Sequence, residues 1–247
     1  MFDLSVVQWV MAVLAALSVG ISKAGFSGVG IIQVYLMTEL FGIHQVGVLL
    51  PMLIVADLIV FPAYRKHGSW PPVWTLLWPA LVGMLAGFYL LGKMPEGLAK
   101  PLIGGIILLM AALQLVRKNR PEAFQPFAES RSYGAGAGVV AGFATAVANA
   151  AGPVFQLFLL SRNIPKFELI GIGARFFLLI NLIKLPFTGG LGLTTGESLL
   201  FNLKLVPVIF LGVVVGKWLL ERVSQKWFER LVLIFALLAG GKLLLFS

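Results

Sequence analysis

Hydrophobic residues dominate this chain in eight long runs, which are separated by short polar connectors. Most of the runs are close to the roughly 20 residues that a transmembrane helix needs. The first and the fifth are longer and contain glycine and polar residues near the middle, which predicts a broken helix or a hairpin. The pattern predicts an all-α polytopic membrane protein with about eight transmembrane segments. The runs cover residues 6–37, 46–64, 72–91, 98–116, 135–161, 167–187, 199–220 and 227–246.

The two longer runs are interrupted by different residues. The first break reads Ser22-Lys23-Ala24-Gly25, and the second reads Asn149-Ala150-Ala151-Gly152-Pro153. Proline is favoured in the first turn of a helix, because the N–H that it lacks is not needed there. A half-helix that begins at Pro153 would direct free backbone N–H groups into the membrane centre. That arrangement binds anions and recurs at the repeat interfaces of transporters.

A hydrophilic linker, residues 117–134, separates two halves that have similar motifs in the same order. The stretch Asp57–Pro62 (DLIVFP) matches Asn181–Pro186 (NLIKLP), and a glutamine, Gln33 or Gln156, precedes an apolar run in each half. We therefore expect an internal duplication. Its first repeat covers residues 1–116 and its second repeat covers residues 135–247.

Pairs of glycines four residues apart occur in both halves. This spacing allows helices to approach closely, and we expect it to serve packing. The pairs are Gly83 with Gly87, Gly138 with Gly142, and Gly212 with Gly216.

The distribution of basic residues favours inverted repeats over parallel ones. Connector 188–195 has no Lys or Arg, whereas the connectors at 162–166 and 222–230 and the linker are basic. If each broken segment is a hairpin, each half has five passes, and all the basic connectors lie in the cytoplasm as the positive-inside rule requires. Both termini then lie outside the cytoplasm. Parallel repeats are the alternative.

Composition supports lipid as the solvent, because 59% of the residues are hydrophobic and 12% are charged, with a mean hydropathy of +0.97. Soluble domains are about half apolar and a quarter charged. The net charge of +9 arises largely from connector residues, so we expect the bilayer and not nucleic acid as the partner. Cysteine is absent, which excludes thiolate metal sites. We expect no metal, no cofactor, a place in the cell membrane, and a second copy of the chain as a candidate partner.

Charged and polar residues deep in the apolar runs are the candidates for chemistry, because a charge at a helix centre costs about 2.5–3.5 kcal/mol. Arg175 offers an anion five donors in a fixed fork. Asp57 is either a proton-coupling group or the counter-charge of Arg175. Asn181 lies about 120° from Arg175 around the helix and could border the same cavity. Lys184 is nine residues from Arg175 and so faces away, and we expect its side chain to snorkel to the membrane surface.

The two breaks supply the remaining candidates for an anion site. Lys23 lies at the first break, where exposed backbone must line a cavity or be buried in protein. Asn149, Gly152 and Pro153 lie at the second break, and Gln33 and Gln156 follow the breaks within the second half-helices. For both glutamines, hydrogen bonding in the core is the alternative. We expect Arg175, Lys23 and the N–H groups after Gly152 to converge on one anion site.

A serine protease of the rhomboid-like intramembrane class is an alternative, because Gly25-Phe26-Ser27-Gly28 fits its GxSG motif. Such an enzyme needs a histidine at membrane depth to activate Ser27. His44 and His67, the two histidines of the chain, lie at connectors. We therefore expect no enzyme activity and keep the protease as a remote alternative.

The chain resembles the TauE/SafE (TSUP) family of sulfite exporters. The resemblance spans the chain and rests on the stretches 23–30, 141–153 and 166–175. It implies transport of a sulfur-containing anion such as sulfite, sulfoacetate or thiosulfate. Because no nucleotide-binding segment is present, the proton gradient is the simplest energy source for export. Asp57 is the candidate residue for this coupling. A carboxylate or other organic-anion permease is the second hypothesis.

Overall fold

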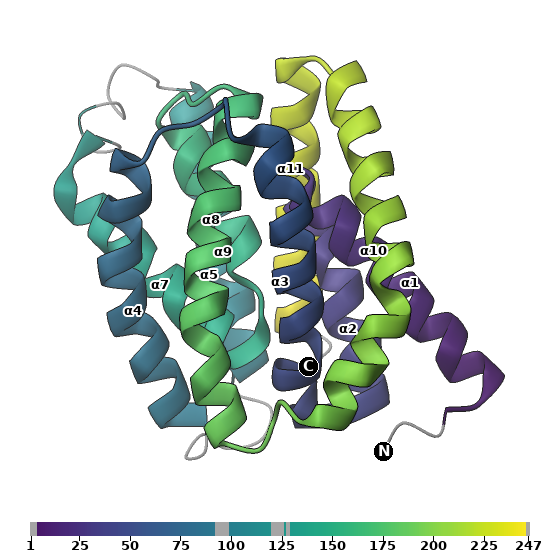
Figure 1. Ribbon diagram of the computed structural model, residues 1–247. Coiled ribbons are helices and arrows are strands. Elements are labelled where there is room, and N and C mark those ends of the chain that lie inside the picture. Colours follow the sequence, from purple (N-terminus) through teal and green to yellow (C-terminus); the bar gives the residue numbers. More distant parts are fainter. Residues whose placement is uncertain (1–3, 92–98, 120–125, 127–128, 246–247) are drawn as a thin grey trace. The chain divides into compact units, whose positions relative to one another are not determined.

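The computed structural model describes residues 4–91, 99–119, 126 and 129–245, and these form helices joined by short connectors (Figure 1). Within the described residues, five helices are long and apolar enough to cross a membrane, namely α1, α3, α4, α9 and α10. The all-α polytopic fold is therefore confirmed. Both long runs are broken: α1 is followed by a short 3-10 turn and α2, and α7 is followed by α8.

The helices belong to two compact units. The first comprises residues Met1–Lys66 and Ala174–Val223, and the second comprises His67–Gly173 and Ser224–Ser247. The boundary falls within α9 (Lys166–Gly190). The first unit contains α1 (Val6–Lys23), α2 (Gly30–Phe41), α3 (Gln45–Tyr64) and α10 (Gly196–Arg222). The second contains α4 (Pro71–Leu91), α5 (Ala99–Asn119), α7 (Arg131–Ala148), α8 (Ala151–Ser161) and α11 (Gln225–Leu245).

The compact units do not follow the repeats expected from the sequence. Each unit takes helices from before and after the linker, much of which lies outside the described residues. Repeats are defined by similar sequences, whereas compact units are defined by contacts in space. The repeat boundaries at residues 116 and 135 therefore stay a prediction.

Polar side chains define where several helices begin. Ser5 and Gln8 form a reciprocal capping box at the start of α1, and Thr195 and Ser198 form another at the start of α10. Each box satisfies backbone N–H groups that a helix start leaves without partners. These local interactions fix the residue at which each helix starts, and they do not depend on burial.

Close glycine contacts hold α1 against α10 and α4 against α7 (Figure 1). A Cβ atom on Gly212 would overlap the carbonyl oxygen of Leu17, and a Cβ atom on Gly142 would overlap that of Ala80. The backbones touch because glycine has no side chain to separate them. The prediction that the glycine pairs serve helix packing is confirmed.

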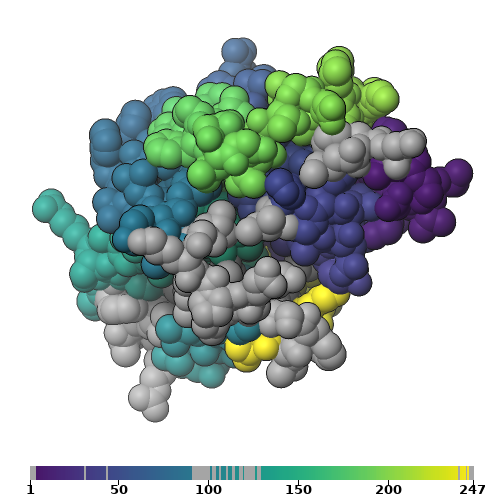
Figure 2. Space-filling view, turned by 90° about the horizontal axis from the view of Figure 1, so that it is seen from below, coloured from purple at the N-terminus to yellow at the C-terminus, as the bar shows by residue number. Residues whose placement is uncertain are grey.

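One face of α1 lies in the core of the first unit, where its small and aliphatic side chains Ala12, Ala15 and Val19 are fully buried. The opposite face of the same helix is exposed at Val6, Val7 and Val10, as a helix that faces lipid would be. In Figure 2 the start of α1, coloured purple, lies at the edge of the molecular face that is shown.

Candidate functional site

The first helix ends inside the predicted first span because Gly25 redirects the chain. The N–H of Phe26 donates to the carbonyl of Ile21, and the N–H of Gly25 donates to that of Ser22. This is the hydrogen-bond pattern of a Schellman motif, which satisfies the last carbonyls of a helix. Gly25 has a φ of 147°, a conformation that favours glycine. Lys23 therefore occupies the last turn of α1 at a point where the sequence predicts membrane depth.

The ammonium of Lys23 forms a buried ion pair with Asp57. Its Nζ lies 2.7 Å from Oδ1 of Asp57 and 4.4 Å from the ring centroid of Phe177. The side chains of Lys23 and Asp57 are 11% and 1% exposed, so water contributes little to screening the pair. The negative end of the α1 dipole and the face of the Phe177 ring both favour a cation at this position.

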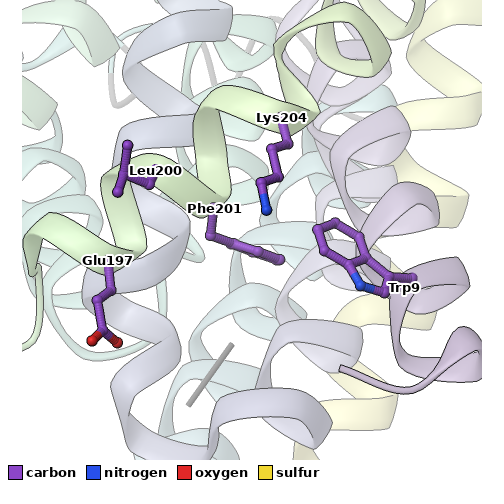
Figure 3. A pocket seen from close by; sticks show the side chains of 5 residues that line it. All are labelled: Trp9, Glu197, Leu200, Phe201 and Lys204. Atoms are coloured by element: carbon purple, nitrogen blue, oxygen red, sulfur yellow. The ribbon is translucent and has the colours of Figure 1, made fainter. Parts of the chain in front are cut away.

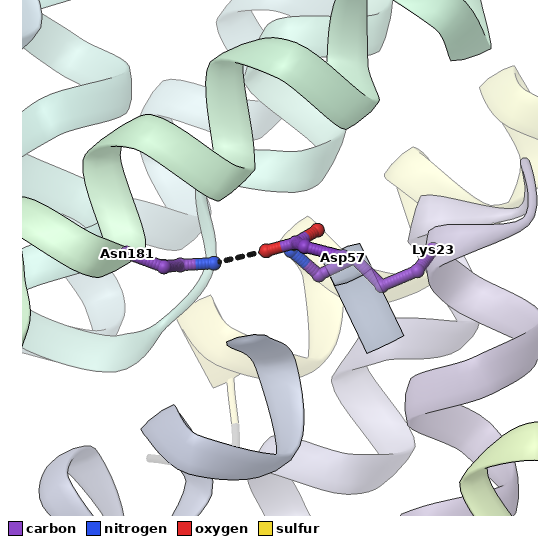
Figure 4. Close-up of polar contacts among 3 residues, drawn as sticks. All are labelled: Lys23, Asp57 and Asn181. Atoms are coloured by element: carbon purple, nitrogen blue, oxygen red, sulfur yellow. Dashed lines mark hydrogen bonds and ion pairs between the residues drawn. The ribbon is translucent and has the colours of Figure 1, made fainter. Parts of the chain in front are cut away.

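Asn181 completes the coordination of the Asp57 carboxylate (Figure 4). Its Nδ2 donates a 2.7 Å hydrogen bond to Oδ2 of Asp57, while Oδ1 faces Lys23. Asp57 and Asn181 are the two residues that the sequence comparison of the halves placed at equivalent positions. Their direct contact brings α3 and α9 together at corresponding points of the two halves.

Lys184 is a site residue whose burial the sequence argument missed. We expected it to snorkel to the surface, but its side chain is fully buried. Lys184 follows Asn181 by three residues, which places both on one face of α9. It lies within electrostatic range of Lys23 and Asp57. The expectation was wrong because we took Arg175 as the residue that marks the site and calculated the direction of Lys184 around the helix relative to it. Measured from Asn181, the same geometry would have placed Lys184 beside the carboxylate.

Arg175 lies at the end of α3 and not beside Asp57. Its guanidinium donates a 2.7 Å hydrogen bond to the carbonyl oxygen of Arg65, and it lies 5.7 Å from the ring centroid of Phe61. Arg65 is eight residues after Asp57, or about 12 Å along a helix. The structure thus separates Arg175 from the Lys23–Asp57 pair, and Lys23 takes the counter-charge role that we had considered for Arg175.

A polar corner lies at the start of α2. A Cβ atom on Gly30 would lie 2.9 Å from Oγ of Ser22 and 3.6 Å from Nε2 of Gln33, so both side chains approach the Gly30 backbone. Oγ of Ser27 and Oε1 of Gln33 are buried without a hydrogen-bond partner among the described residues. Buried polar atoms of this kind represent unused capacity for hydrogen bonding.

The second break lies in the second unit, between α7 and α8. Asn149 ends α7 in the left-handed conformation, with φ 54° and ψ 28°. Helix α8 begins at Ala151, two residues before the predicted start, and Pro153 lies in its first turn. Pro153 and Gln156 are buried, and Asn149 and Gly152 are half-buried.

A cavity of about 160 Å³ lies near the starts of α1 and α10 and is separate from the ion pair (Figure 3). The ammonium of Lys204 lies 5.6 Å from the centroid of the Trp9 ring. The centroids of the Trp9 and Phe201 rings are 5.5 Å apart. Trp9 precedes Lys23 by 14 residues, or about 21 Å along a helix. The other residues that line the cavity are Glu197 and Leu200.

A polytopic helical membrane protein with buried charges at a broken helix has the features of the secondary-transporter class. The family model described as "Sulfite exporter TauE/SafE" matches residues 12–243. The chain therefore belongs to the TauE/SafE family, whose members are transporters, and the sequence resemblance is confirmed. No curated protein and no solved structure matches the sequence. Among the described residues, no group of three or more His, Cys, Asp or Glu side chains could hold a metal ion.

Proposed function

We propose that this protein transports a small sulfur-containing anion across the cell membrane together with a proton, so that the proton gradient drives the movement of the anion. Sulfite, a sulfonate such as sulfoacetate, and thiosulfate are the candidate substrates. The observation that carries the proposal is the buried ion pair between Lys23, at the break after α1, and Asp57 of α3. Membership of the sulfite exporter family supports the class of substrate.

A buried ion pair of this kind is suited to coupling. An uncompensated charge at membrane depth is costly, so Lys23 requires a negative partner. Protonation of Asp57 removes that partner and leaves the Lys23 ammonium to attract an anion. Loss of the proton restores the ion pair and favours release of the anion. Proton movement and anion movement then depend on the same two side chains.

An inverted repeat would give this pair two alternating routes of access. Helix α1 packs on α10, and α7, its counterpart after the linker, packs on α4, the counterpart of α10. Asp57 and Asn181, at matching places in the two halves, also contact each other. Inverted repeats that meet at a central binding site are a common design of secondary transporters. These correspondences support an internal duplication, and the charge-free connector 188–195 favours the inverted arrangement.

Transport in proteoliposomes tests the proposal. We expect the purified protein to accumulate sulfite against its gradient when a pH gradient is imposed. Asp57→Asn should abolish this accumulation and retain exchange of labelled for unlabelled sulfite, because the coupling proton is lost while the cationic site remains. Lys217→Gln, on the exposed face of α10, is the control and should behave like the parent. If Asp57→Asn retains accumulation driven by the pH gradient, Asp57 does not carry the coupling proton.

A carboxylate or other organic-anion permease is the second candidate, and the chemistry of the cations supports it. Lys23 and Lys184 are point charges without the planar fork by which arginine matches an oxyanion. An ammonium binds a carboxylate as readily as a sulfonate. Competition of labelled sulfite uptake by acetate, malonate and sulfoacetate separates the two candidates. Inhibition by the carboxylates alone would identify an organic-anion permease.

A further inference from the structure

The cavity near the starts of α1 and α10 is lined by one face of α10 and by Trp9 of α1. Glu197, Phe201 and Lys204 follow one another at intervals of four and three residues, which places them on the same face of the helix. Trp9 lies opposite, and the Lys204 side chain extends toward its ring (Figure 3). The cavity therefore has a carboxylate at one end, an ammonium at the other, and aromatic rings beside the ammonium.

The cavity lies where the membrane span of α10 begins. Glu197 precedes the apolar run 199–220, whereas Lys204 lies five residues after Leu199, or about 7.5 Å further along the helix. Trp9 is the fourth residue of α1, and tryptophan is enriched where the hydrocarbon of a bilayer meets the headgroups. The Lys204 ammonium reaches this ring, as expected of a lysine that extends toward the membrane surface. The cavity is thus at the level of the lipid headgroups, with Lys204 on its deeper side and Glu197 on its outer side.

The two charged side chains of the cavity are available to a ligand. Glu197 and Lys204 are both exposed, and they are about 10.5 Å apart along the helix axis. Within the part of the chain that the structure describes, neither of them forms an ion pair. A lysine inside the boundary of the hydrocarbon is costly without a negative partner. A ligand with a negative group on its deeper side and a positive group on its outer side would pair with both residues.

The size and the surroundings of the cavity favour a lipid over an enclosed soluble molecule. Its volume of about 160 Å³ is smaller than the roughly 300–1,000 Å³ of pockets that enclose a small molecule. A headgroup can occupy it while the acyl chains lie outside. An exposed apolar stripe begins at the cavity and continues along α10 toward the middle of the span. It consists of Leu200, Leu203, Pro207 and Phe210.

We propose that this cavity binds the headgroup of a phospholipid that has a primary ammonium, as phosphatidylethanolamine does. The phosphate, which is the deeper group of such a lipid, pairs with Lys204, and the outer ammonium donates hydrogen bonds to Glu197. One acyl chain lies on the stripe that begins at Leu200. The trimethylammonium of phosphatidylcholine has no N–H to donate, and phosphatidylglycerol has no positive group to offset Glu197. The site is separate from the Lys23–Asp57 pair and does not depend on the transported anion.

Native mass spectrometry of the purified protein in detergent tests the site. The probes are phosphatidylethanolamine, phosphatidylcholine and phosphatidylglycerol with identical acyl chains, at equal concentration. We expect phosphatidylethanolamine to bind the parent most tightly. Lys204→Gln should lower this affinity on the order of 10- to 100-fold, the scale of a lost charge-assisted hydrogen bond. Lys217→Gln, on the same helix but away from the cavity, is the matched control and should leave all three affinities unchanged.

A charge reversal at Glu197 tests the choice of headgroup. Glu197→Lys gives the cavity two ammonium groups, so phosphatidylglycerol should now bind more tightly than phosphatidylethanolamine. A residue that only stabilises the helix start would not change the order of the lipids. O-phosphoethanolamine, which has the same headgroup charges but no acyl chains, should displace the lipid only at a large excess.

Three outcomes would overturn the proposal. The first is a parent protein that binds phosphatidylglycerol or phosphatidylcholine as tightly as phosphatidylethanolamine. The second is an unchanged order and strength of lipid binding in both Lys204→Gln and Glu197→Lys, which would place the bound lipid elsewhere. The third is displacement by O-phosphoethanolamine at equal concentration, which would indicate a soluble ligand. If a variant does not fold, as judged by gel filtration, lipid selectivity and displacement in the parent still decide the proposal.

Discussion

The two halves of the chain share a helix order but contribute different chemistry to the buried cluster. The first half supplies Lys23 at its break and Asp57 on α3. The second half supplies Asn181 and Lys184 on α9, while the residues of its break, 149–153, are uncharged. Asp57 and Asn181 hold equivalent positions and touch. Two carboxylates in this contact would repel each other, so one carboxylate and one amide make a stable pair with a single negative charge.

We expect the largest effect in cysteine labelling, which tests whether the two halves are inverted. The chain has no cysteine, so single cysteines can be introduced without background. Leu191→Cys, 58% exposed in the uncharged connector after α9, should react with a membrane-impermeant maleimide in intact cells. Ser132→Cys, exposed at the start of α7, should react only after permeabilisation. Labelling of Ser132→Cys alone in intact cells would contradict the proposed orientation of the second half.

The second test exchanges the equivalent residues. Asp57→Asn leaves Lys23 buried without its carboxylate and should lower the free energy of unfolding by about 3–5 kcal/mol. Asp57→Asn/Asn181→Asp moves the carboxylate to α9, beside Lys184, and should recover more than half of this loss. Unfolding in detergent, followed by far-UV circular dichroism, measures both changes. A swap variant no more stable than Asp57→Asn would show that the two positions are not interchangeable.

The third test compares a packed glycine with an open one on the same helix. Gly142→Ala places a Cβ atom against the Ala80 carbonyl, and we expect it to cost about 1–3 kcal/mol through overpacking. Gly136→Ala is the control, because a Cβ atom there meets no atom within 4 Å. It should stabilise the helix by about 0.5–1 kcal/mol. Gly212→Ala on α10 should resemble Gly142→Ala if the two interfaces are equivalent.

Most of the fold could be predicted from the sequence, because length and hydrophobicity determine a transmembrane segment almost locally. The eight runs correspond to helices, and the breaks fall where glycine and polar residues interrupt them. The glycine pairs also predicted close helix contacts correctly, since only a missing side chain permits them.

The candidate site was harder to predict, because it depends on which helix faces pack together. The angle between Arg175 and Asn181 could be calculated within one helix, but nothing local indicates that Arg175 lies at the end of α3. The same lack of tertiary information led to the wrong expectation for Lys184. The pairing of Asp57 with Asn181 did carry a signal, since both residues occupy the same place in the matched stretches 57–62 and 181–186.

The smallest effect is expected from the residues that form the two breaks. Gly25, with a φ of 147°, ends α1, whereas Asn149, with a φ of 54°, ends α7. Gly25→Ala forces a side chain into a conformation that L-residues avoid and should cost about 1–2 kcal/mol. Asn149→Gly removes a mild strain but adds freedom to the unfolded chain, so its net effect should stay below about 1 kcal/mol. Gly25→Ala should also weaken sulfite binding, because the turn at Gly25 fixes the direction of Lys23. Equal stability and equal binding for both variants, by calorimetry, would show that the first break does not position the cluster.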